Sequence, residues 1–198
     1  MPTDPSYTPA ADIARDREHL ISRFIATRRQ SEQIAGRLSV EDQQVQSMPD
    51  VSPTKWHLAH VTWFFETFVL KPHAPGYDEF DPAFGYLFNS YYETLGPRHA
   101  RPDRGLLTRP SNDEVMAYRA HVDQAVRAFM LTSDDETFAA AADLLELGIH
   151  HEQQHQELAL MDIKHVLSCN PLAPAYRKKE PVSVRETHTL GWFDIEGG

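Results

Sequence analysis

Residues 148–157 read Gly148-Ile-His-His-Glu-Gln-Gln-His-Gln-Glu157, and this stretch bears on the fold class and the candidate chemistry together. Its residues favour an α-helix, on which His151 and His155, four positions apart, face the same side one turn from each other. Two imidazoles in that arrangement can share a metal ion. The same residues also read H-E-x-x-H, the signature of zinc proteases, in which Glu152 is the general base. The stretch therefore predicts a helical metal site with two alternative chemistries.

Helix-forming sequence extends through most of the chain around this stretch. Four segments are predicted to be helices: 10–36, 52–70, 111–129 and 134–167. No convincing β-alternation precedes residue 180, and no period of about 20 to 50 residues repeats. The prediction is an all-α, four-helix bundle in which a long crossover, residues 72–110, joins the second helix to the third.

Local start signals set the expected helix boundaries. Ser52 followed by Pro53 predicts an N-cap and the first helical position of the second helix. Ser111 and Glu114 have the spacing of a capping box at the start of the third helix. Asp134 precedes the fourth helix, and the segment 39–49 is expected to be a polar link.

The crossover is aromatic and rich in proline, and a connection of this length in a compact domain is more often functional than idle. Its second half holds a basic cluster within an acidic chain: Arg98, His99, Arg101, Arg104 and Arg109. Such a cluster suits a small anionic ligand better than a polymer.

The 198 residues include 41% hydrophobic types and carry a formal charge of −10. These values predict a globular domain that does not bind nucleic acid, because a phosphate backbone would repel the chain. No segment approaches the roughly 18 apolar residues of a membrane span, and no signal-peptide pattern opens the chain. The single cysteine, Cys169, excludes an internal disulfide and fits the reducing cytoplasm. We expect it to be a small buried apolar residue.

A metal site needs a third ligand, because transition metals take at least three protein ligands. The second helix offers His57 and His60, and His60 lies on its more apolar side. A set of His60, His151 and His155 would place three imidazoles on one side of the ion, and it suits Fe(II), Zn(II), Ni(II) or Cu(II). Its neutral ligands would favour an anionic substrate such as a thiolate. The plain alternative is that H-x-x-x-H is ordinary helix surface.

Neighbouring polar residues have alternative roles. Glu152, Gln156 and Asp162 are candidate acceptors for imidazole N–H groups. In the zinc-protease interpretation Glu152 is instead the general base and Glu180 the third ligand. That interpretation is disfavoured, since zinc proteases carry an upstream sheet that aligns the peptide, and none is predicted here. The remaining histidines are expected to be ordinary surface or structural residues: His19, His73, His99, His121, His150, His165 and His188.

Four longer motifs carry a resemblance to a known family. They read SPTKWHLAHVTWFFE at 52–66, LFNSYYE at 87–93, RPDRGLLTRP at 101–110 and HHEQQHQE at 150–157. In this order they resemble the N-terminal DinB-like domain of the sulfoxide synthases of ergothioneine biosynthesis, the nonhaem iron enzymes also called hercynine oxygenases. The resemblance covers residues 10–198 and is far more specific than H-x-x-x-H.

The resemblance implies an Fe(II) cofactor bound by His60, His151 and His155. It implies an iron-dependent oxidoreductase that uses oxygen to join a thiol, cysteine or γ-glutamylcysteine, to hercynine, with formation of a sulfoxide. Arg101 and Arg104 would bind the carboxylate of the thiol substrate. No catalytic residue is assigned in this chain, because the resemblance puts the catalytic tyrosine in a C-terminal domain. Selenium transfer and ovothiol-type regiochemistry stay open as alternatives.

The expected domains are a disordered N-terminus at 1–9, the metal-binding bundle at 10–170, and a linker at 171–198 with the opening of a domain similar to formylglycine-generating enzyme. Gly-Trp-Phe-Asp-Ile-Glu-Gly-Gly at 191–198 resembles that opening. The chain alone is expected to be incomplete for catalysis and to need the C-terminal domain in cis or in trans. Two alternatives are a stand-alone DinB-like metal-dependent thiol transferase and a non-catalytic metal-binding half-protein that needs a partner chain.

Overall fold

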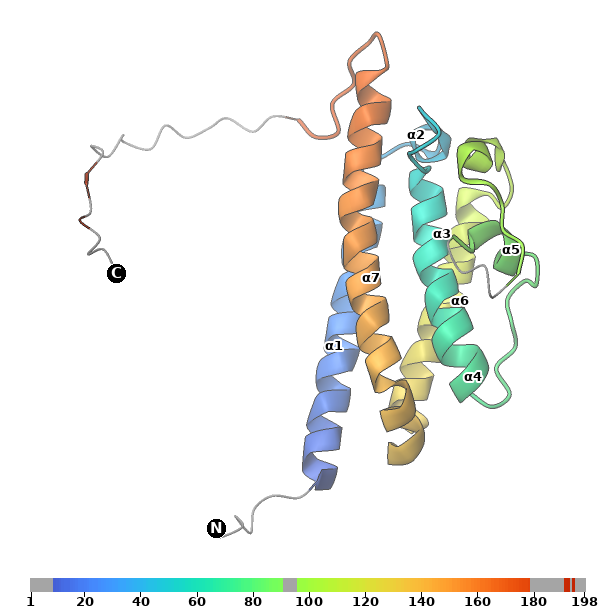
Figure 1. Cartoon of the computed structure of the whole chain (residues 1–198), viewed down its shortest axis with the longest axis vertical. Coiled ribbons are helices and arrows are strands. Elements are labelled where there is room, and N and C mark those ends of the chain that lie inside the picture. The colour runs from blue at the N-terminus through green and yellow to red at the C-terminus, as the bar shows by residue number, and fades with distance from the viewer. Residues whose placement is uncertain (1–8, 91–95, 179–190, 193, 195–198) are drawn as a thin grey trace.

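Four long helices lie side by side and form the body of the protein (Figure 1). The computed structural model describes residues 9–90, 96–178, 191, 192 and 194. The bundle helices are α1 (Pro9–Ala35), α3 (Thr54–Phe65), α6 (Asn112–Thr132) and α7 (Asp135–Ser168). Shorter helices extend or connect them: α2 (Val40–Gln44), η1 (Glu66–Leu70), α4 (Lys71–His73), α5 (Phe84–Phe88) and η3 (Arg101–Leu106). No strand occurs in the described residues, so the predicted all-α bundle is confirmed for them.

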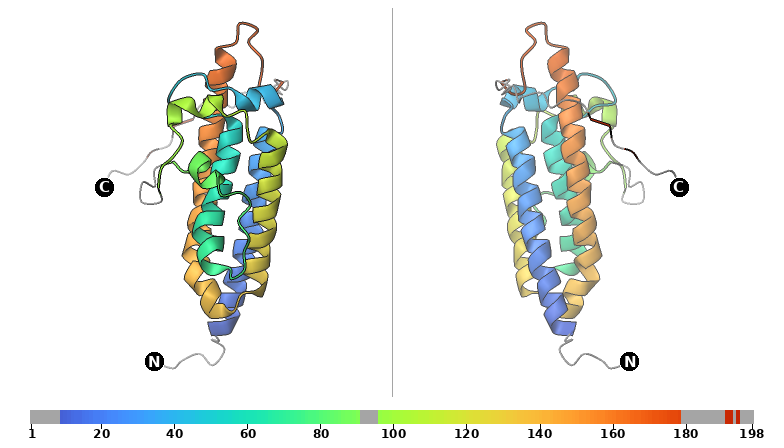
Figure 2. Two further views of the ribbon diagram at one scale, coloured as in Figure 1. Left: turned by 90° about the vertical axis from the view of Figure 1, so that its right-hand side faces the viewer. Right: turned by 90° about the vertical axis from the view of Figure 1, so that its left-hand side faces the viewer.

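The crossover determines which helices run in the same direction. α1 and α7 run one way, whereas α3 and α6 run the opposite way (Figures 1 and 2). Because α3 and α6 are parallel, the chain must return along the bundle between them, and it does so through α5 and η3. A hydrogen bond of 2.9 Å from Arg104 Nη1 to Ser52 Oγ joins η3 to the start of α3. The arginine cluster of the crossover therefore lies at that end of the bundle.

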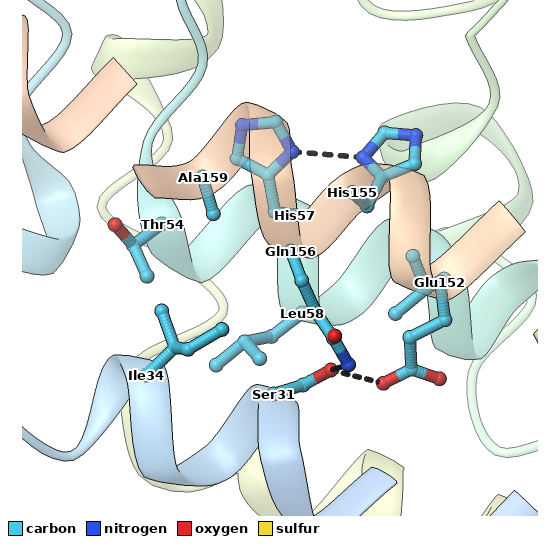
Figure 3. A pocket seen from close by; sticks show the side chains of 10 residues that line it. Ser31, Ile34, Thr54, His57, Leu58, Glu152, His155, Gln156 and Ala159 are labelled. Atoms are coloured by element: carbon cyan, nitrogen blue, oxygen red, sulfur yellow. Dashed lines mark hydrogen bonds between the residues drawn. The ribbon is translucent and has the colours of Figure 1, made fainter. Parts of the chain in front are cut away.

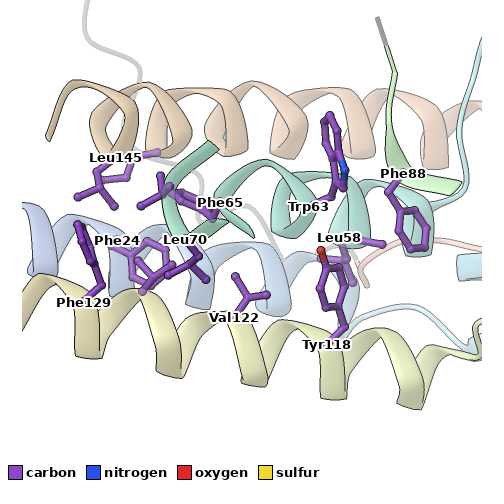
Figure 4. Close-up of a cluster of buried hydrophobic side chains, with 14 of the residues drawn as sticks. Phe24, Leu58, Trp63, Phe65, Leu70, Phe88, Tyr118, Val122, Phe129 and Leu145 are labelled. Carbon is purple, nitrogen blue, oxygen red and sulfur yellow. The ribbon is translucent and has the colours of Figure 1, made fainter. Parts of the chain in front are cut away.

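Helix α3 lies at the centre of the bundle and contacts both α6 and α7. Every one of its residues is buried, including His57 and His60. Its side chains meet those of the other helices in one apolar core, in which Figure 4 shows Phe24, Phe65 and Leu145. A helix buried on all sides has no solvent face. The sequence assigned only His60 to the more apolar side of this helix, whereas the structure buries His57 as well.

Capping side chains begin two of the bundle helices as predicted. Ser111 Oγ accepts a hydrogen bond from Glu114 N at 3.2 Å, and Glu114 Oε2 accepts one from Ser111 N at 2.6 Å. Asp134 is the N-cap residue of α7 and accepts a hydrogen bond from Thr137 N at 2.8 Å. Because each cap satisfies backbone N–H groups that have no helical partner, the starts of α6 and α7 are well defined.

Two local predictions are wrong. Pro53, not Ser52, is the N-cap residue of α3, and no side chain caps this helix. Ser52 instead binds tertiary partners: its hydroxyl accepts from Arg104, and its N–H donates to Asp162 at 2.8 Å. The polar link expected at 39–49 contains the short helix α2, which begins with its own capping box.

A buried carboxylate attaches the first half of the crossover to the bundle. Glu66, in the π-helical turn η1, accepts hydrogen bonds from Tyr77 Oη at 2.6 Å and from Tyr118 Oη at 2.5 Å. A third hydrogen bond, at 3.1 Å, comes from Phe80 N. Burial and this carboxylate raise the pKa of Tyr118 well above its usual value, so the phenol keeps the proton that it donates. The network joins the end of α3, the crossover and α6.

Predictions for both ends of the chain fall mainly outside the described residues. These are the disordered N-terminus, of which Pro9 is described as the first residue of α1, and most of the linker and second-domain opening. Of 191–198 the structure describes Gly191, Trp192 and Asp194, which have no regular structure. Glu180 and His188 also lie outside. Cys169, expected to be buried, is exposed.

None of the described helices combines the length and the apolarity that a membrane span requires.

Candidate metal centre

Three imidazoles from two helices converge inside the bundle. His60 comes from α3, and His151 and His155 come from α7. One ring nitrogen of each lies within 4.8 Å of a ring nitrogen of the other two. The ring centroids are 5.0 Å apart for His60 and His151, and 4.6 Å apart for each of the other two pairs. The structure brings together the three residues proposed from the sequence, and this histidine group could hold a metal ion.

Burial keeps the histidine group neutral. His60 is 2% exposed, and burial, with His151 beside it, holds its pKa well below the usual value. Burial lowers the pKa of His151 to about 4. Burial, followed by the neighbouring His60 and His57, also lowers the pKa of His155. A neutral imidazole has a lone pair on one nitrogen, which is the form that a metal ion binds.

The hydrogen bonds of the three rings are compatible with metal binding. The Phe88 carbonyl can only accept, so His60 donates to it from Nδ1 at 2.6 Å and keeps its lone pair on Nε2. His155 uses Nδ1 in a contact of 2.8 Å with His57 Nδ1. His151 Nδ1 is buried, and no residue in the described part of the chain hydrogen-bonds it. Leaving a buried ring nitrogen without a hydrogen-bond partner costs about 1–3 kcal/mol. The three rings form a set of nitrogen donors that fits a metal ion.

Two further residues, His57 and Asp162, continue the hydrogen-bond network from His155. His57 Nε2 is 3.0 Å from Asp162 Oδ2, and the same oxygen accepts the Ser52 N–H at 2.8 Å. His57 and Asp162 are 5% and 3% exposed. Asp162, expected to accept an imidazole N–H, accepts it from His57, which sequence reasoning did not select. In the sequence, the only signal for His57 was its position three residues before His60. Its contact with His155 arises only when α3 packs against α7.

Glu152 turns toward α1 and α6. Its Oε2 accepts from Arg28 Nη1 at 2.8 Å, and its Oε1 accepts from Ser31 Oγ at 2.6 Å and from Arg119 Nη2 at 3.2 Å. Burial alone would raise its pKa, but the two guanidiniums lower it to about 2. A carboxylate held in this way is no general base, so the zinc-protease interpretation is wrong. Glu152 and Gln156 were expected to accept imidazole N–H groups, but in the described part of the chain both hydrogen-bond Ser31 instead, and Figure 3 shows them beside it.

A basic pocket of about 350 Å³ lies at the start of α3. Arginine and histidine side chains dominate its lining: Arg98, His99, Arg101 and Arg104, together with Ser90. Arg109, the last member of the predicted cluster, is not among the lining residues. Arg101 is partly exposed and donates a hydrogen bond to the carbonyl of Asp50.

Arg104 links this basic pocket to the histidine group. Its guanidinium carbon lies 3.4 Å from the centroid of the Trp56 ring, and that ring stacks on His60 at 4.6 Å. Hydrogen bonds to Ser52 and Ser90 hold Arg104 in place. After burial and the neighbouring His151, its positive charge also contributes to the lowered pKa of His60. The arrangement suits a small anion that reacts beside a metal ion.

A family profile described as the DinB superfamily matches residues 23–159. The matched region runs from α1 into α7 and includes all three residues of the histidine group. No curated protein matches the chain.

Proposed function

Because this chain belongs to the DinB superfamily, whose domains are often metal-binding, we propose that it is the metal-binding part of an iron-dependent sulfoxide synthase. The observation that carries the proposal is the convergence of His60, His151 and His155 next to a basic pocket. In this proposal the three imidazoles hold one Fe(II). The substrates are oxygen, hercynine and a thiol, either cysteine or γ-glutamylcysteine.

The proposed reaction consumes one molecule of oxygen for each thiol joined to hercynine. A carbon–sulfur bond forms between the thiol and the imidazole ring of hercynine, while the S–H bond and one ring C–H bond break. Oxygen takes up four electrons, so that one of its atoms becomes the sulfoxide oxygen and the other leaves as water. Bound iron supplies the redox chemistry and the open coordination positions that oxygen requires.

In this proposal the residues of this chain bind the metal ion and orient the thiol substrate. Neutral imidazoles do not reduce the positive charge of the ion, and this favours a thiolate over a neutral ligand. Arg101 and Arg104 bind the carboxylate of the thiol substrate, since a guanidinium matches a carboxylate with two parallel hydrogen bonds. A tyrosine-bearing domain, in cis or in trans, supplies the proton and much of the hercynine pocket.

A stand-alone thiol transferase is the second candidate. The superfamily match covers the bundle and the histidine group, which such an enzyme would also use, without oxygen chemistry. A metal-binding half-protein that depends on a partner chain would share the same group. The three functions differ in what happens after a metal binds.

Iron stoichiometry tests the site. Protein loaded with Fe(II) under anaerobic conditions should retain one iron per chain after desalting. His60→Ala, His151→Ala and His155→Ala should each lose it. The matched control is His150→Ala, since His150 is exposed and directly precedes His151. Full iron occupancy in all three ligand variants would overturn the assignment.

Product analysis then separates the functions. Oxygen uptake is measured with hercynine and each thiol, with and without a second domain added in trans. Oxygen uptake with a matching amount of sulfoxide product, lost in His151→Ala, supports the synthase. Thiol transfer to an electrophile without oxygen uptake supports the transferase. Iron binding without either reaction supports the half-protein.

A further inference from the structure

His57 lies between the histidine group and a buried carboxylate. Its Nδ1 is 2.8 Å from His155 Nδ1, a contact drawn in Figure 3, and its Nε2 is 3.0 Å from Asp162 Oδ2. Both His57 and Asp162 are buried. Neither residue belongs to the proposed ligand set. Burying an imidazole and a carboxylate costs free energy unless their hydrogen bonds are satisfied, so the burial of this pair calls for an explanation.

The direction of these hydrogen bonds follows from the carboxylate. Two ring nitrogens at 2.8 Å share one hydrogen, because one must donate it and the other must accept it. Asp162 Oδ2 already accepts the N–H of Ser52, and a carboxylate only accepts, so His57 donates to it from Nε2. Because His57 is buried, its ring takes the neutral form with a single N–H, and that N–H is the one donated to Asp162. His57 Nδ1 is therefore an acceptor.

The tautomer of His57 in turn determines that of His155. Because His57 Nδ1 accepts, His155 donates from its own Nδ1. A neutral imidazole carries a single N–H, so Nε2 of His155 carries no hydrogen and presents a lone pair. The three side chains from Asp162 through His57 to His155 thus select one tautomer of a candidate ligand.

We propose that His57 and Asp162 are positioning residues that hold His155 in the Nδ1–H tautomer, with Nε2 free to bind a metal ion. The inference rests on the metal-binding role proposed for His155. The Phe88 carbonyl imposes the same tautomer on His60 directly. Asp162 follows His155 by seven residues on α7, about 10.5 Å along the helix axis. His57, from α3, spans that distance.

Substitutions at His57 should change metal affinity in a graded way. Without its acceptor, His155 is free to carry its proton on Nε2, where the proton blocks the metal. Hydrogen-bond partners of metal-ligating histidines contribute roughly 10- to 100-fold to affinity. We therefore expect His57→Phe, which keeps a ring of similar size, to raise the Zn(II) dissociation constant by about that factor. His57→Asn, whose amide oxygen takes the place of Nδ1, should restore part of the affinity.

The first experiment needs no metal. Long-range ¹H–¹⁵N spectra of metal-free protein with ¹⁵N-labelled histidine distinguish protonated from bare ring nitrogens. His155 should show a protonated Nδ1 and a bare Nε2, and Asp162→Ala should weaken this preference. A protonated Nε2 on His155 in the wild-type protein would overturn the inference. This result does not depend on whether the proposed function is correct.

The second experiment measures Zn(II) affinity by competition with a chelator for wild type, His57→Phe and His57→Asn. His165→Phe is the matched control, because His165 is also on α7 and hydrogen-bonds Ser47 at 2.7 Å, outside the histidine group. Equal affinities for wild type and His57→Phe overturn the positioning role. Failure of the wild type to bind Zn(II) counts against the proposed metal site, and the tautomer measurement then decides the inference by itself.

Discussion

Arg28 Nη1 lies 2.8 Å from Glu152 Oε2, and the two side chains are 4% and 1% exposed. Glu152 directly follows His151 in α7, so one turn of this helix carries a candidate ligand and a buried charge on different sides. Arg28 comes from α1, and Arg119, from α6, is 3.2 Å from the other carboxylate oxygen. The carboxylate therefore joins three helices of the bundle at the level of the histidine group.

Glu152→Ala should destabilise the fold. The substitution removes the carboxylate that two buried guanidiniums share, and of these Arg28 keeps its ion pair with Asp123 at 2.7 Å. Removal of one partner of a buried ion pair costs about 3–5 kcal/mol. We expect the free energy of unfolding in urea to fall by that amount. Glu157→Ala, at an exposed position of the same helix, should change it by less than about 0.5 kcal/mol. A Glu152→Ala protein of unchanged stability that has lost only activity would contradict this anchoring role.

The metal-free protein should lose stability as the pH falls from about 6.5 to about 4. His151 has a pKa of 6.5 in the unfolded chain and about 4 in the folded one. Between these values the unfolded state binds a proton that the folded state does not, so a lower pH favours unfolding. The slope reaches about 1.4 kcal/mol per pH unit for each such histidine. The lowered pKa values of His60 and His155 act in the same direction.

Urea unfolding in the presence of a chelator measures this slope. His151→Phe should make it shallower, whereas His150→Phe, at the exposed neighbouring position, should leave it as it is. Glu152 acts in a lower window: its pKa is about 2 in the fold against 4.5 otherwise, so its contribution is present above pH 4.5 and lost as the pH falls toward 2. A free energy of unfolding that stays constant from about pH 7 to pH 5 contradicts the burial of neutral imidazoles.

Sequence patterns predicted the features that depend on near neighbours in the chain. The capping box of Ser111 and Glu114 and the pair His151 and His155 each rest on a spacing of three or four residues in one helix, and both are found in the structure. The contact of His57 with His155 joins residues 98 positions apart, and that of Arg28 with Glu152 joins residues 124 apart. No local spacing encodes such pairs.

Helix α3 illustrates a second limit of sequence patterns. Hydrophobic periodicity assigns a direction to a polar residue only when the helix has a solvent face, and every residue from Thr54 to Phe65 is buried. The pattern therefore could not say what His57 contacts. Ser52 failed as a predicted cap for a related reason, because its hydrogen bonds go to the distant residues Arg104 and Asp162.

Gly148→Ala should destabilise the protein even though alanine is the better helix former. A Cβ at this position would lie 2.5 Å from Phe65 Cε1, in the contact between α7 and α3. Overpacking costs about 1–3 kcal/mol, whereas replacing a helical glycine gains about 1 kcal/mol at most. Gly85→Ala, with no atom within 4 Å of the added Cβ, isolates the helix preference and should be neutral or stabilising. Urea unfolding compares the two, and a more stable Gly148→Ala protein contradicts the close approach of the helices.

Arg101 should give the site a preference for thiols that carry a carboxylate. Arg101 and Arg104 line the same pocket, but Arg104 is buried against Trp56, so its removal would also disturb packing. Arg101→Ala removes a partly exposed guanidinium and leaves that packing intact. A hydrogen bond between charged groups contributes about 1.5–3 kcal/mol, which corresponds to roughly 10- to 150-fold in affinity.

Cysteine and cysteamine measure this preference, because they share the thiol and only cysteine has the carboxylate. The visible absorption of Co(II)-loaded protein reports the binding of either thiol. The wild type should bind cysteine more tightly than cysteamine by the factor above. Arg101→Ala should strongly reduce this difference, because it weakens the binding of cysteine alone. Arg109→Ala, outside the pocket lining, should keep the wild-type preference. Equal affinities in the wild type would exclude Arg101 from thiol recognition and leave the basic pocket to another anion.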